Sequence, residues 1–153
     1  MAVEKIGVVG AGQMGNGIAH VLALAGYDVV LDDINKDALS KAIGLIEKNM
    51  QRQAHKGIIK EEQIKPALAR IRTTQTLDDL RDRDLVMEAA TEDEAVKKKI
   101  FQDLCQRISP KAIIATNTSS ISVTRLAAST DRPESFIGLH FMNPVPLMQL
   151  VEV

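Results

Sequence analysis

The chain has 153 residues, of which 45% are hydrophobic, so it has the size of a single domain and can bury one sizeable core. Its 19 Lys and Arg residues against 20 Asp and Glu residues give a net charge of −1 without a long block of either sign, which argues against a nucleic-acid-binding protein. One cysteine, Cys105, excludes an internal disulfide, and no apolar run approaches the ~20 residues of a membrane span. With no signal-peptide pattern at the N-terminus, the sequence predicts a cytoplasmic domain without a nucleic-acid or membrane partner.

Short β-branched runs alternate with helical patterns along the chain, and no internal repeat or low-complexity linker interrupts them. This alternation is typical of a parallel sheet covered by helices. The fold class that follows is α/β, with a doubly wound, mainly parallel sheet and helices on both faces. The predicted strands are Lys5–Val9, Asp28–Asp33, Ile71–Thr74, Asp84–Ala89, Ala112–Thr116 and Phe136–Phe141, and a last apolar segment lies at Gln149–Val153.

The helices are indicated by apolar periodicity and by the residues that start or stop them. Asn35 can cap a long helix, and Gly57 marks its end. Pro66 interrupts a helix-like stretch, and Pro110 stops a charged helix. The segment 51–70 is long for a crossover between strands, so we expect a helical excursion there. The predicted helices lie at 13–25, between Asn35 and Gly57, at 61–70 and at 94–108.

Residues 5–20 read KIGVVGAGQMGNGIAH, and Gly10, Gly12 and Gly15 form the pattern G-x-G-x-x-G between a predicted strand and a predicted helix. The first glycine allows a tight turn, the second lets a pyrophosphate approach the backbone, and the third lets helix and strand pack closely. Gly17 is an additional glycine, to which we assign only packing. The pattern predicts a Rossmann-type dinucleotide-binding domain over residues 1–153. We expect the cofactor site to be lined by these three glycines and by Gln13 and Met14.

An acidic residue is expected at the end of the second strand of such a domain. Asp33 lies there, about 20 residues after Gly15, and can accept hydrogen bonds from the adenosine ribose. Asp32 points to the opposite face by strand alternation, so only one of the two reaches the ribose, and we favour Asp33. An acid here repels a 2′-phosphate and no arginine follows it closely, which predicts NAD rather than NADP. The fingerprint alone also allows FAD, and in a purely structural alternative these glycines and aspartates only make turns.

The three histidines differ in context. His20 lies inside the first predicted helix and is interpreted as a residue of the helix face. His55 lies at a helix end, where interactions with the helix dipole explain it. His140 ends an apolar run and precedes Asn143, so it is placed where the C-terminal ends of parallel strands form a ligand crevice.

The strings GAGQMGNGIAH, ATNTSS and GLHFMNPVPLMQLVEV together resemble the NAD-binding domain of the 3-hydroxyacyl-CoA dehydrogenase family, in particular the short-chain 3-hydroxybutyryl-CoA dehydrogenases. The resemblance covers essentially the whole chain. GLHFMNPVP is more specific than the glycine fingerprint, because other dehydrogenases with that fingerprint lack it. The resemblance implies NAD-dependent oxidation of (S)-3-hydroxyacyl-CoA, with 3-hydroxybutyryl-CoA as the expected substrate, in fatty acid β-oxidation or butanoate metabolism.

The resemblance also assigns roles to individual residues. It makes His140 the catalytic base and Glu152 its carboxylate partner. It places Ser119 against the substrate hydroxyl and the nicotinamide, and it places Asn143 in the same site. It implies that Glu92 and Lys97 hold the cofactor. With Asn117, which we also expect at the cofactor, the candidate residues in this part of the chain are Glu92, Lys97, Asn117, Ser119, His140, Asn143 and Glu152, and no metal site is expected.

Elementary chemistry supports the proposed pair independently of the resemblance. Oxidation of a secondary alcohol removes the hydroxyl proton as hydride leaves carbon, and imidazole can take and return a proton near neutral pH. A carboxylate such as Glu152 would fix the tautomer of His140 and stabilise its imidazolium. If the chain returns antiparallel after a turn, the two side chains meet across the strands at about 5 Å. Ser119 follows the fifth predicted strand, where its hydroxyl can donate to the developing alkoxide. Without the resemblance, a hydroxyl that caps the loop is the better interpretation of Ser119.

The family continues beyond LVEV into a helical domain that this sequence does not contain. The resemblance therefore implies the cofactor-binding half of an enzyme, able to bind NAD but inactive or weakly active alone. The alternative is a stand-alone NAD(H)-binding module with a regulatory or sensing role. A related β-hydroxyacid dehydrogenase is less favoured, because those enzymes lack the HFMNP string. We also expect self-association through the apolar surface of residues 142–151.

Overall fold

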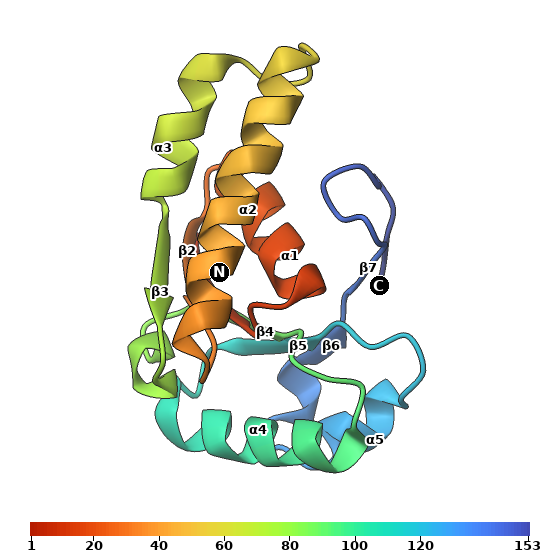
Figure 1. Ribbon diagram of the computed structural model, residues 1–153. Coiled ribbons are helices and arrows are strands. Elements are labelled where there is room, and N and C mark those ends of the chain that lie inside the picture. Colours follow the sequence, from red (N-terminus) through yellow and green to blue (C-terminus); the bar gives the residue numbers. More distant parts are fainter.

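The structure, a computed structural model that describes residues 1–153, contains a six-stranded sheet in the order β3-β2-β1-β4-β5-β6 (Figure 1). All neighbouring strands of this sheet pair in parallel. A separate antiparallel pair joins β7 (His140–Phe141) to β8 (Val151–Glu152). The predicted doubly wound α/β fold is therefore confirmed. The strands of the main sheet are β1 (Lys5–Val9), β2 (Asp28–Asp32), β3 (Ile71–Thr74), β4 (Leu85–Glu88), β5 (Ile113–Thr116) and β6 (Phe136–Gly138).

Helices cover both faces of the sheet. Figure 1 shows α1, α2 and α3 on one side of it and α4 and α5 on the other. None of them combines the length and the apolar character that crossing a membrane requires. The helices are α1 (Gln13–Leu24), α2 (Lys36–His55), α3 (Ile64–Ala69), α4 (Glu94–Arg107) and α5 (Val123–Ala127), with short 3-10 turns η1 (Glu61–Gln63), η2 (Leu77–Leu80) and η3 (Pro133–Ser135).

The strand order reverses beside β1. The chain runs outward from β1 to β3 and then returns to β4 on the other side of β1. In open parallel sheets, ligands bind in the crevice outside the C-terminal ends of the strands at such a reversal. The segments that leave β1, β4 and β5 at this edge are residues 10–12, 89–93 and 117–122. The topology therefore places the candidate site in these loops.

The structure differs from the sequence-based expectations in three places. The predicted strand Phe136–Phe141 is divided, because the chain leaves the main sheet after β6 and pairs β7 with β8 instead. Helix α5 was not predicted, although Ser122 caps it by accepting a hydrogen bond from the Arg125 N–H. Pro66 does not interrupt α3, because it lies in the first turn, where the missing N–H needs no partner. The helical excursion in 51–70 is present as the end of α2 and as α3.

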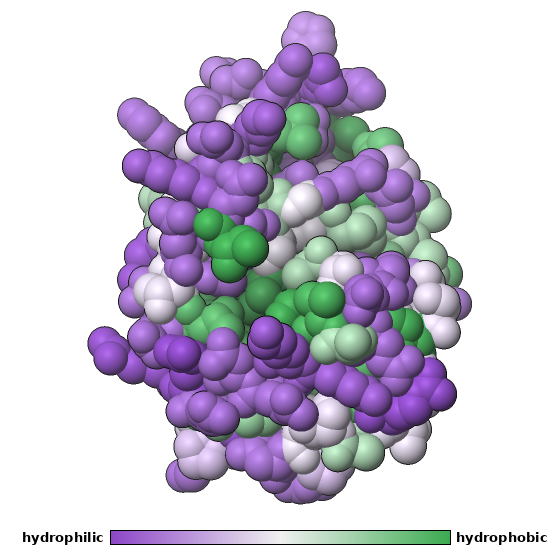
Figure 2. All heavy atoms as spheres, turned by 60° about the horizontal axis from the view of Figure 1, so that its bottom comes forward, coloured by the Kyte–Doolittle hydropathy of each residue, from purple (hydrophilic) through white to green (hydrophobic).

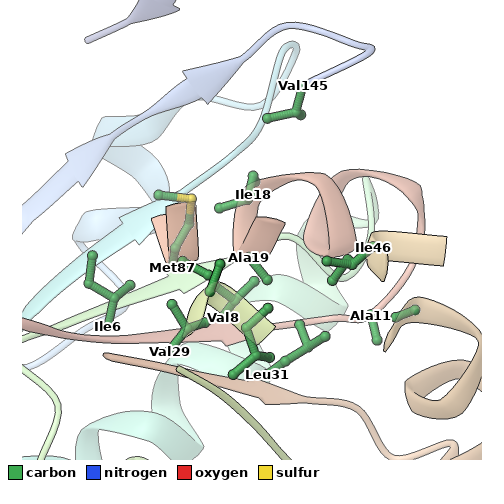
Figure 3. Close-up of a cluster of buried hydrophobic side chains, with 14 of the residues drawn as sticks. Ile6, Val8, Ala11, Ile18, Ala19, Val29, Leu31, Ile46, Met87 and Val145 are labelled. Carbon is green, nitrogen blue, oxygen red and sulfur yellow. The ribbon is translucent and has the colours of Figure 1, made fainter. Parts of the chain in front are cut away.

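Two hydrophobic clusters fill the spaces above and below the sheet. The larger joins β1 and β2 to α1 and α2, and the smaller packs the opposite face of the sheet against α4. Figure 3 shows Val145 above Ile18 of α1, although Val145 belongs to the loop between β7 and β8. Packing of this kind supplies most of the driving force for folding. One residue of a distant loop thus takes part in the main core.

A buried ion pair lies under the C-terminal ends of β4 and β5. The Lys97 ammonium of α4 donates to Glu88 Oε1 at 2.5 Å, and both side chains are at most 1% exposed. The Thr116 hydroxyl donates to the same oxygen at 2.9 Å, and the Ala90 N–H donates to Glu88 Oε2 at 2.8 Å. The carboxylate thus has hydrogen-bond donors on both oxygens, which offsets the cost of burying its charge.

We predict that Lys97→Met lowers the free energy of unfolding by about 3–5 kcal/mol, because it leaves the Glu88 carboxylate buried without its counter-charge. Urea denaturation followed by circular dichroism measures the loss. The double variant Lys97→Met/Glu88→Gln removes both charges and is expected to lose less than the single variant. Lys99→Met, at an exposed position of the same helix, is the matched control. Equal losses at positions 97 and 99 would contradict the role of the ion pair.

A second buried polar group is the carboxyl of Asp32 at the end of β2. Its side chain is 3% exposed, and its Oδ1 atom has no hydrogen-bond partner. Burial raises the pKa of Asp32 to about 7, with further contributions from the carboxylates of Asp33 and Asp79. The folded protein therefore holds a proton that the unfolded chain releases near the ordinary Asp pKa of about 3.9. Stability contributed by this group falls as the pH rises from about 4 to about 7.

We predict that Asp32→Asn stabilises the protein more at pH 8 than at pH 5, by a difference of about 1–3 kcal/mol, because the amide stays neutral at both. Urea unfolding at the two pH values measures the difference. Asp37→Asn, at an exposed position in the first turn of α2, is the matched control and should show no such dependence. A gain that is equal at both pH values would show that the Asp32 carboxyl is not protonated in the folded state.

Candidate active site

The glycine fingerprint forms the turn between β1 and α1. Gly10 has a φ of +105°, and a Cβ there would lie 2.7 Å from the Ala89 carbonyl oxygen, so only glycine fits. A Cβ on Gly15 would overlap the carbonyl oxygen of Gly10, whereas a Cβ on Gly12 would meet nothing within 4 Å. This arrangement agrees with the expected roles of the three glycines, which are a turn, an open approach and close packing.

The N-terminus of α1 is free to bind an anion. Gly12 is its N-cap, and neither a side-chain cap nor an acidic residue occupies its first turn. By contrast, the side chains of Asn35 and Asp93 cap α2 and α4. The N–H groups of the first turn of α1, which include those of Gln13 and Met14, point at the space outside the turn. These residues fit the pyrophosphate of a dinucleotide.

Asp33 connects the end of β2 to the fingerprint turn. Its Oδ2 accepts a hydrogen bond from the Ala11 N–H at 2.9 Å, and its Oδ1 accepts one from the Asn35 N–H at 2.8 Å. Asp33 is partly exposed, whereas its neighbour Asp32 is buried on the opposite face of the strand, as alternation predicts. Of the two acids, Asp33 is the one placed at the fingerprint.

Ile34 is a candidate residue that the sequence analysis missed. It follows Asp33 directly, and its side chain is 89% exposed. The Gln75 side chain donates to its carbonyl oxygen at 3.0 Å and so holds the backbone at this position. The signal in the sequence is an isoleucine immediately after Asp33, the acid expected at the ribose, where an apolar surface can lie against a flat base.

His140 and Glu152 meet across the antiparallel pair β7–β8. They are directly opposite in the register, and His140 Nδ1 lies 3.0 Å from Glu152 Oε2. The antiparallel return expected from the sequence is therefore present. Because a carboxylate can only accept, Nδ1 carries the proton, which leaves the lone pair of Nε2 free in the neutral ring. Geometrically, this is a histidine prepared to take a proton at Nε2.

The loop after β5 holds this strand pair in place. Asn117 is buried, and its Oδ1 accepts a hydrogen bond from the Phe141 N–H at 2.8 Å. The Leu139 N–H donates to the Thr116 carbonyl oxygen at 3.0 Å. Asn117, which we expected at the cofactor, thus has an observed contact that supports the backbone next to His140. Sequence reasoning missed this contact because it joins residues that are far apart in the chain.

Glu92 joins the loops that follow β4 and β5. Its Oε2 accepts hydrogen bonds from the hydroxyls of Thr118 at 3.0 Å and Ser120 at 3.1 Å. Ser119 and Asn143 are exposed, and neither makes a hydrogen bond to the His140–Glu152 pair. The structure thus brings Glu92 into the crevice loops and leaves the Ser119 hydroxyl free.

Lys97 is placed differently from the expectation that it holds the cofactor. Its ammonium is buried against Glu88 below the crevice and does not reach the surface. The physical reason is that position 97 lies on the face of α4 that packs against the sheet. There the Lys97 ammonium forms an ion pair with the Glu88 carboxylate. Lys97 therefore supports the floor of the crevice.

The other two histidines lie outside the candidate site. His20 lies on the buried face of α1, in agreement with the expectation of a helix-face residue, and its Nε2 lies 2.7 Å from Gln53 Oε1 of α2. Burial lowers the pKa of His20, partly offset by the hydrogen bond to Gln53. His55 lies exposed in the last turn of α2, as predicted for a helix end. Only His140 combines partial exposure with a carboxylate partner.

Comparison with known proteins shows what this chain is similar to. The family model "3-hydroxyacyl-CoA dehydrogenase, NAD binding domain" matches residues 5–153. A 3-hydroxybutyryl-CoA dehydrogenase of Bradyrhizobium diazoefficiens is 60% identical over 151 residues, which are 99% of this chain and 52% of that protein. A probable 3-hydroxybutyryl-CoA dehydrogenase of Bacillus subtilis is 44% identical over 153 residues and is covered to 53%. This chain thus spans about half the length of the curated relatives it matches.

Solved structures agree with the sequence comparisons. The crystal structure of (S)-3-hydroxybutyryl-CoA dehydrogenase from Ralstonia eutropha superimposes with a TM-score of 0.95 at 45% sequence identity, over 98% of this chain and 53% of that one. The family match covers the fingerprint turn, the end of β2 and the β7–β8 pair. With the uncapped start of α1 and the open space at Gly12, these residues fit NAD. The chain belongs to the 3-hydroxyacyl-CoA dehydrogenase family and contains its NAD-binding domain.

Proposed function

We propose that this chain is the cofactor-binding half of an NAD-dependent dehydrogenase that oxidises (S)-3-hydroxyacyl-CoA, with 3-hydroxybutyryl-CoA as substrate, to the 3-oxoacyl-CoA. The observation that carries the proposal is the contact between His140 Nδ1 and Glu152 Oε2 at 3.0 Å, beside an NAD-binding sheet edge. Relatives that match nearly the whole of this chain are named 3-hydroxybutyryl-CoA dehydrogenases. An acid–base pair at that edge suits proton transfer to and from a substrate hydroxyl.

His140 and Glu152 have different parts in the proposed proton transfer. His140 Nε2 accepts the proton of the substrate hydroxyl as the O–H bond breaks, and it returns this proton in the reverse reaction. Glu152 keeps the proton of the ring on Nδ1 and stabilises the imidazolium that forms. NAD, when bound, accepts the hydride from the carbinol carbon.

Exposed side chains near the pair supply further polar contacts. The Ser119 hydroxyl is free, and in the proposal it donates to the oxygen of the substrate as negative charge develops there. Asn143, in the loop after β7, lines the same side of the site. Glu92 orients the loop that carries Ser119 through its contacts with Thr118 and Ser120.

The cofactor is held by the opposite part of the crevice. The N-terminus of α1, with Gln13 and Met14, binds the pyrophosphate. Asp33 accepts hydrogen bonds from the ribose, and Ile34 provides an apolar surface for the adenine. The contribution of Lys97 is indirect, since it holds Glu88 under the ends of β4 and β5.

A second candidate function is NAD(H) binding without catalysis, in a regulatory or sensing module. The same cofactor residues would serve it, but it gives no use to an oriented histidine and carboxylate. The loop 142–150 adds an apolar surface, because Leu147, Met148 and Leu150 are each about half exposed or more. We propose that this surface favours self-association of the chain at high concentration.

Titration of NADH fluorescence, with and without acetoacetyl-CoA, tests the proposal directly. We expect this chain to bind NADH, and the same chain extended through the helical domain of its relatives to bind both ligands and to reduce acetoacetyl-CoA. Turnover by the unextended chain is expected to be lost or very slow, because in our proposal the helical domain supplies much of the acyl-CoA site. An extended protein that binds NADH but never turns over acetoacetyl-CoA would favour the sensing module.

We predict that Asp33→Ala weakens NAD binding by about tenfold, which corresponds to one or two lost hydrogen bonds. The ratio of the affinity for NAD to the affinity for NADP is expected to fall as well. The physical reason is that the carboxylate bonds the ribose hydroxyls and repels a 2′-phosphate. Fluorescence titrations with NADH and NADPH measure both effects. Asp37→Ala, on the exposed first turn of α2, is the matched control. Equal or tighter binding of NADPH by the parent protein would overturn the assignment of NAD specificity to Asp33.

We predict that Glu152→Gln lowers kcat of the extended protein by at least about a hundredfold and leaves the affinity for NADH unchanged. Glutamine keeps the size of the side chain but removes the charge that stabilises the imidazolium. Steady-state kinetics with acetoacetyl-CoA measure the effect, and Glu134→Gln in η3 is the matched control. A variant that keeps the parent kcat would remove Glu152 from the mechanism.

A further inference from the structure

Gly17 is the glycine that the cofactor fingerprint does not explain. It lies buried within α1, where glycine costs roughly 1 kcal/mol of helix stability relative to alanine. A Cβ at Gly17 would lie 2.9 Å from Val145 Cβ, 3.2 Å from Val145 Cγ2 and 3.6 Å from Pro146 Cδ. These are atoms close to the backbone of another segment, so they cannot move aside without moving that segment. Glycine at this position therefore allows the loop 142–150 to pack directly on α1.

Val145 is the anchor of that loop. It is 4% exposed and belongs to the main core, whereas Leu147 is 64% and Leu150 is 58% exposed. Figure 1 shows the loop beside α1 on the side away from α2, and Figure 3 shows Val145 above Ile18. Figure 2 shows hydrophobic atoms gathered in a hollowed band across one face of the molecule. Most residues of the loop are exposed, and the Gly17–Val145 contact attaches the loop to the core.

The strand pair that this loop connects is too small to hold itself in place. β7 and β8 have two residues each and form no pair with the main sheet. The β7 side is held by the hydrogen bond from the Phe141 N–H to Asn117, but β8 has no such contact with the sheet. Glu152 is 62% exposed as well. Its position opposite His140 therefore depends on the path of the loop.

We propose that Gly17, together with Val145, is a positioning residue for the His140–Glu152 pair. The close approach of the loop to α1 sets where the loop ends, and hence where the Glu152 carboxylate meets Nδ1 of His140. The same helix starts in the fingerprint turn, so one rigid element places both the cofactor end and the proton-transfer end of the site. This role in catalysis rests on the proposed function, whereas the effect on the histidine can be measured without any activity.

The tautomer of His140 is the readout for this proposal. With Glu152 in place, the neutral ring carries its proton on Nδ1, and without it the ring exchanges freely between its two tautomers. Nitrogen-15 chemical shifts of His140 distinguish these states at a pH well above the ordinary His pKa of about 6.5. His55, exposed at the end of α2, provides a free histidine in the same spectrum.

We expect Gly17→Ala to abolish the Nδ1–H signature of His140 while NADH affinity stays within about twofold of the parent. Val145→Ala removes the loop's side of the same contact and is also expected to reduce the Nδ1–H signature of His140. Gly44→Ala in α2, where a Cβ would meet nothing within 4 Å, is the matched control for a helical glycine and should change nothing.

Retention of the Nδ1–H signature by both Gly17→Ala and Val145→Ala would overturn the proposal. A parallel loss of NADH affinity in Gly17→Ala would also overturn it, because Gly17 would then act through the fingerprint turn. If Gly17→Ala does not fold, Val145→Ala decides alone. If the signature responds as expected but the extended protein does not reduce acetoacetyl-CoA, the positioning contact stands and the proposed function fails.

Discussion

Close packing around α1 is the constraint on which the rest of the structure depends. Gly15 lets the start of the helix lie against the Gly10 turn, and Gly10 in turn lies against the end of β4. Two residues further along, Gly17 lies against the loop that carries Val145. A single Cβ at any of these positions would move the helix away from a neighbour that contributes to the site. The cost of so many helical glycines is thus tied to the geometry of the crevice.

Polar contacts then fix the loops at the edge of the sheet. Glu88 and Lys97 form a buried pair below it, and Glu92 binds two hydroxyls of the loop after β5. Asn117 extends this arrangement to the strand of His140. Such contacts add less to stability than the hydrophobic core does, but they have defined directions. They therefore determine where loop backbones lie, while the core determines that the sheet and helices come together.

Asp32 and Asp33 are adjacent at the end of β2, but their side chains lie in different environments. Asp33 reaches the fingerprint turn and keeps hydrogen-bond donors around both carboxylate oxygens. Asp32 lies on the opposite face, and burial raises its pKa to about 7. Strand alternation was sufficient to predict that the two side chains lie on opposite faces of the strand. The environment of the other, including the approach of Asp79, depends on contacts across the sheet.

The sequence by itself determined most of the strands and helices and the turn between β1 and α1. Alternating strand and helix patterns predicted the parallel sheet, and the spacing of Gly10, Gly12 and Gly15 predicted the fingerprint turn, because both signals are local. Only the tertiary structure decided the contacts between distant segments. It placed Lys97 on Glu88, Asn117 on Phe141 and Val145 on Gly17. Nothing in local periodicity carries this information, since such contacts form only when packing of the whole chain brings the segments together.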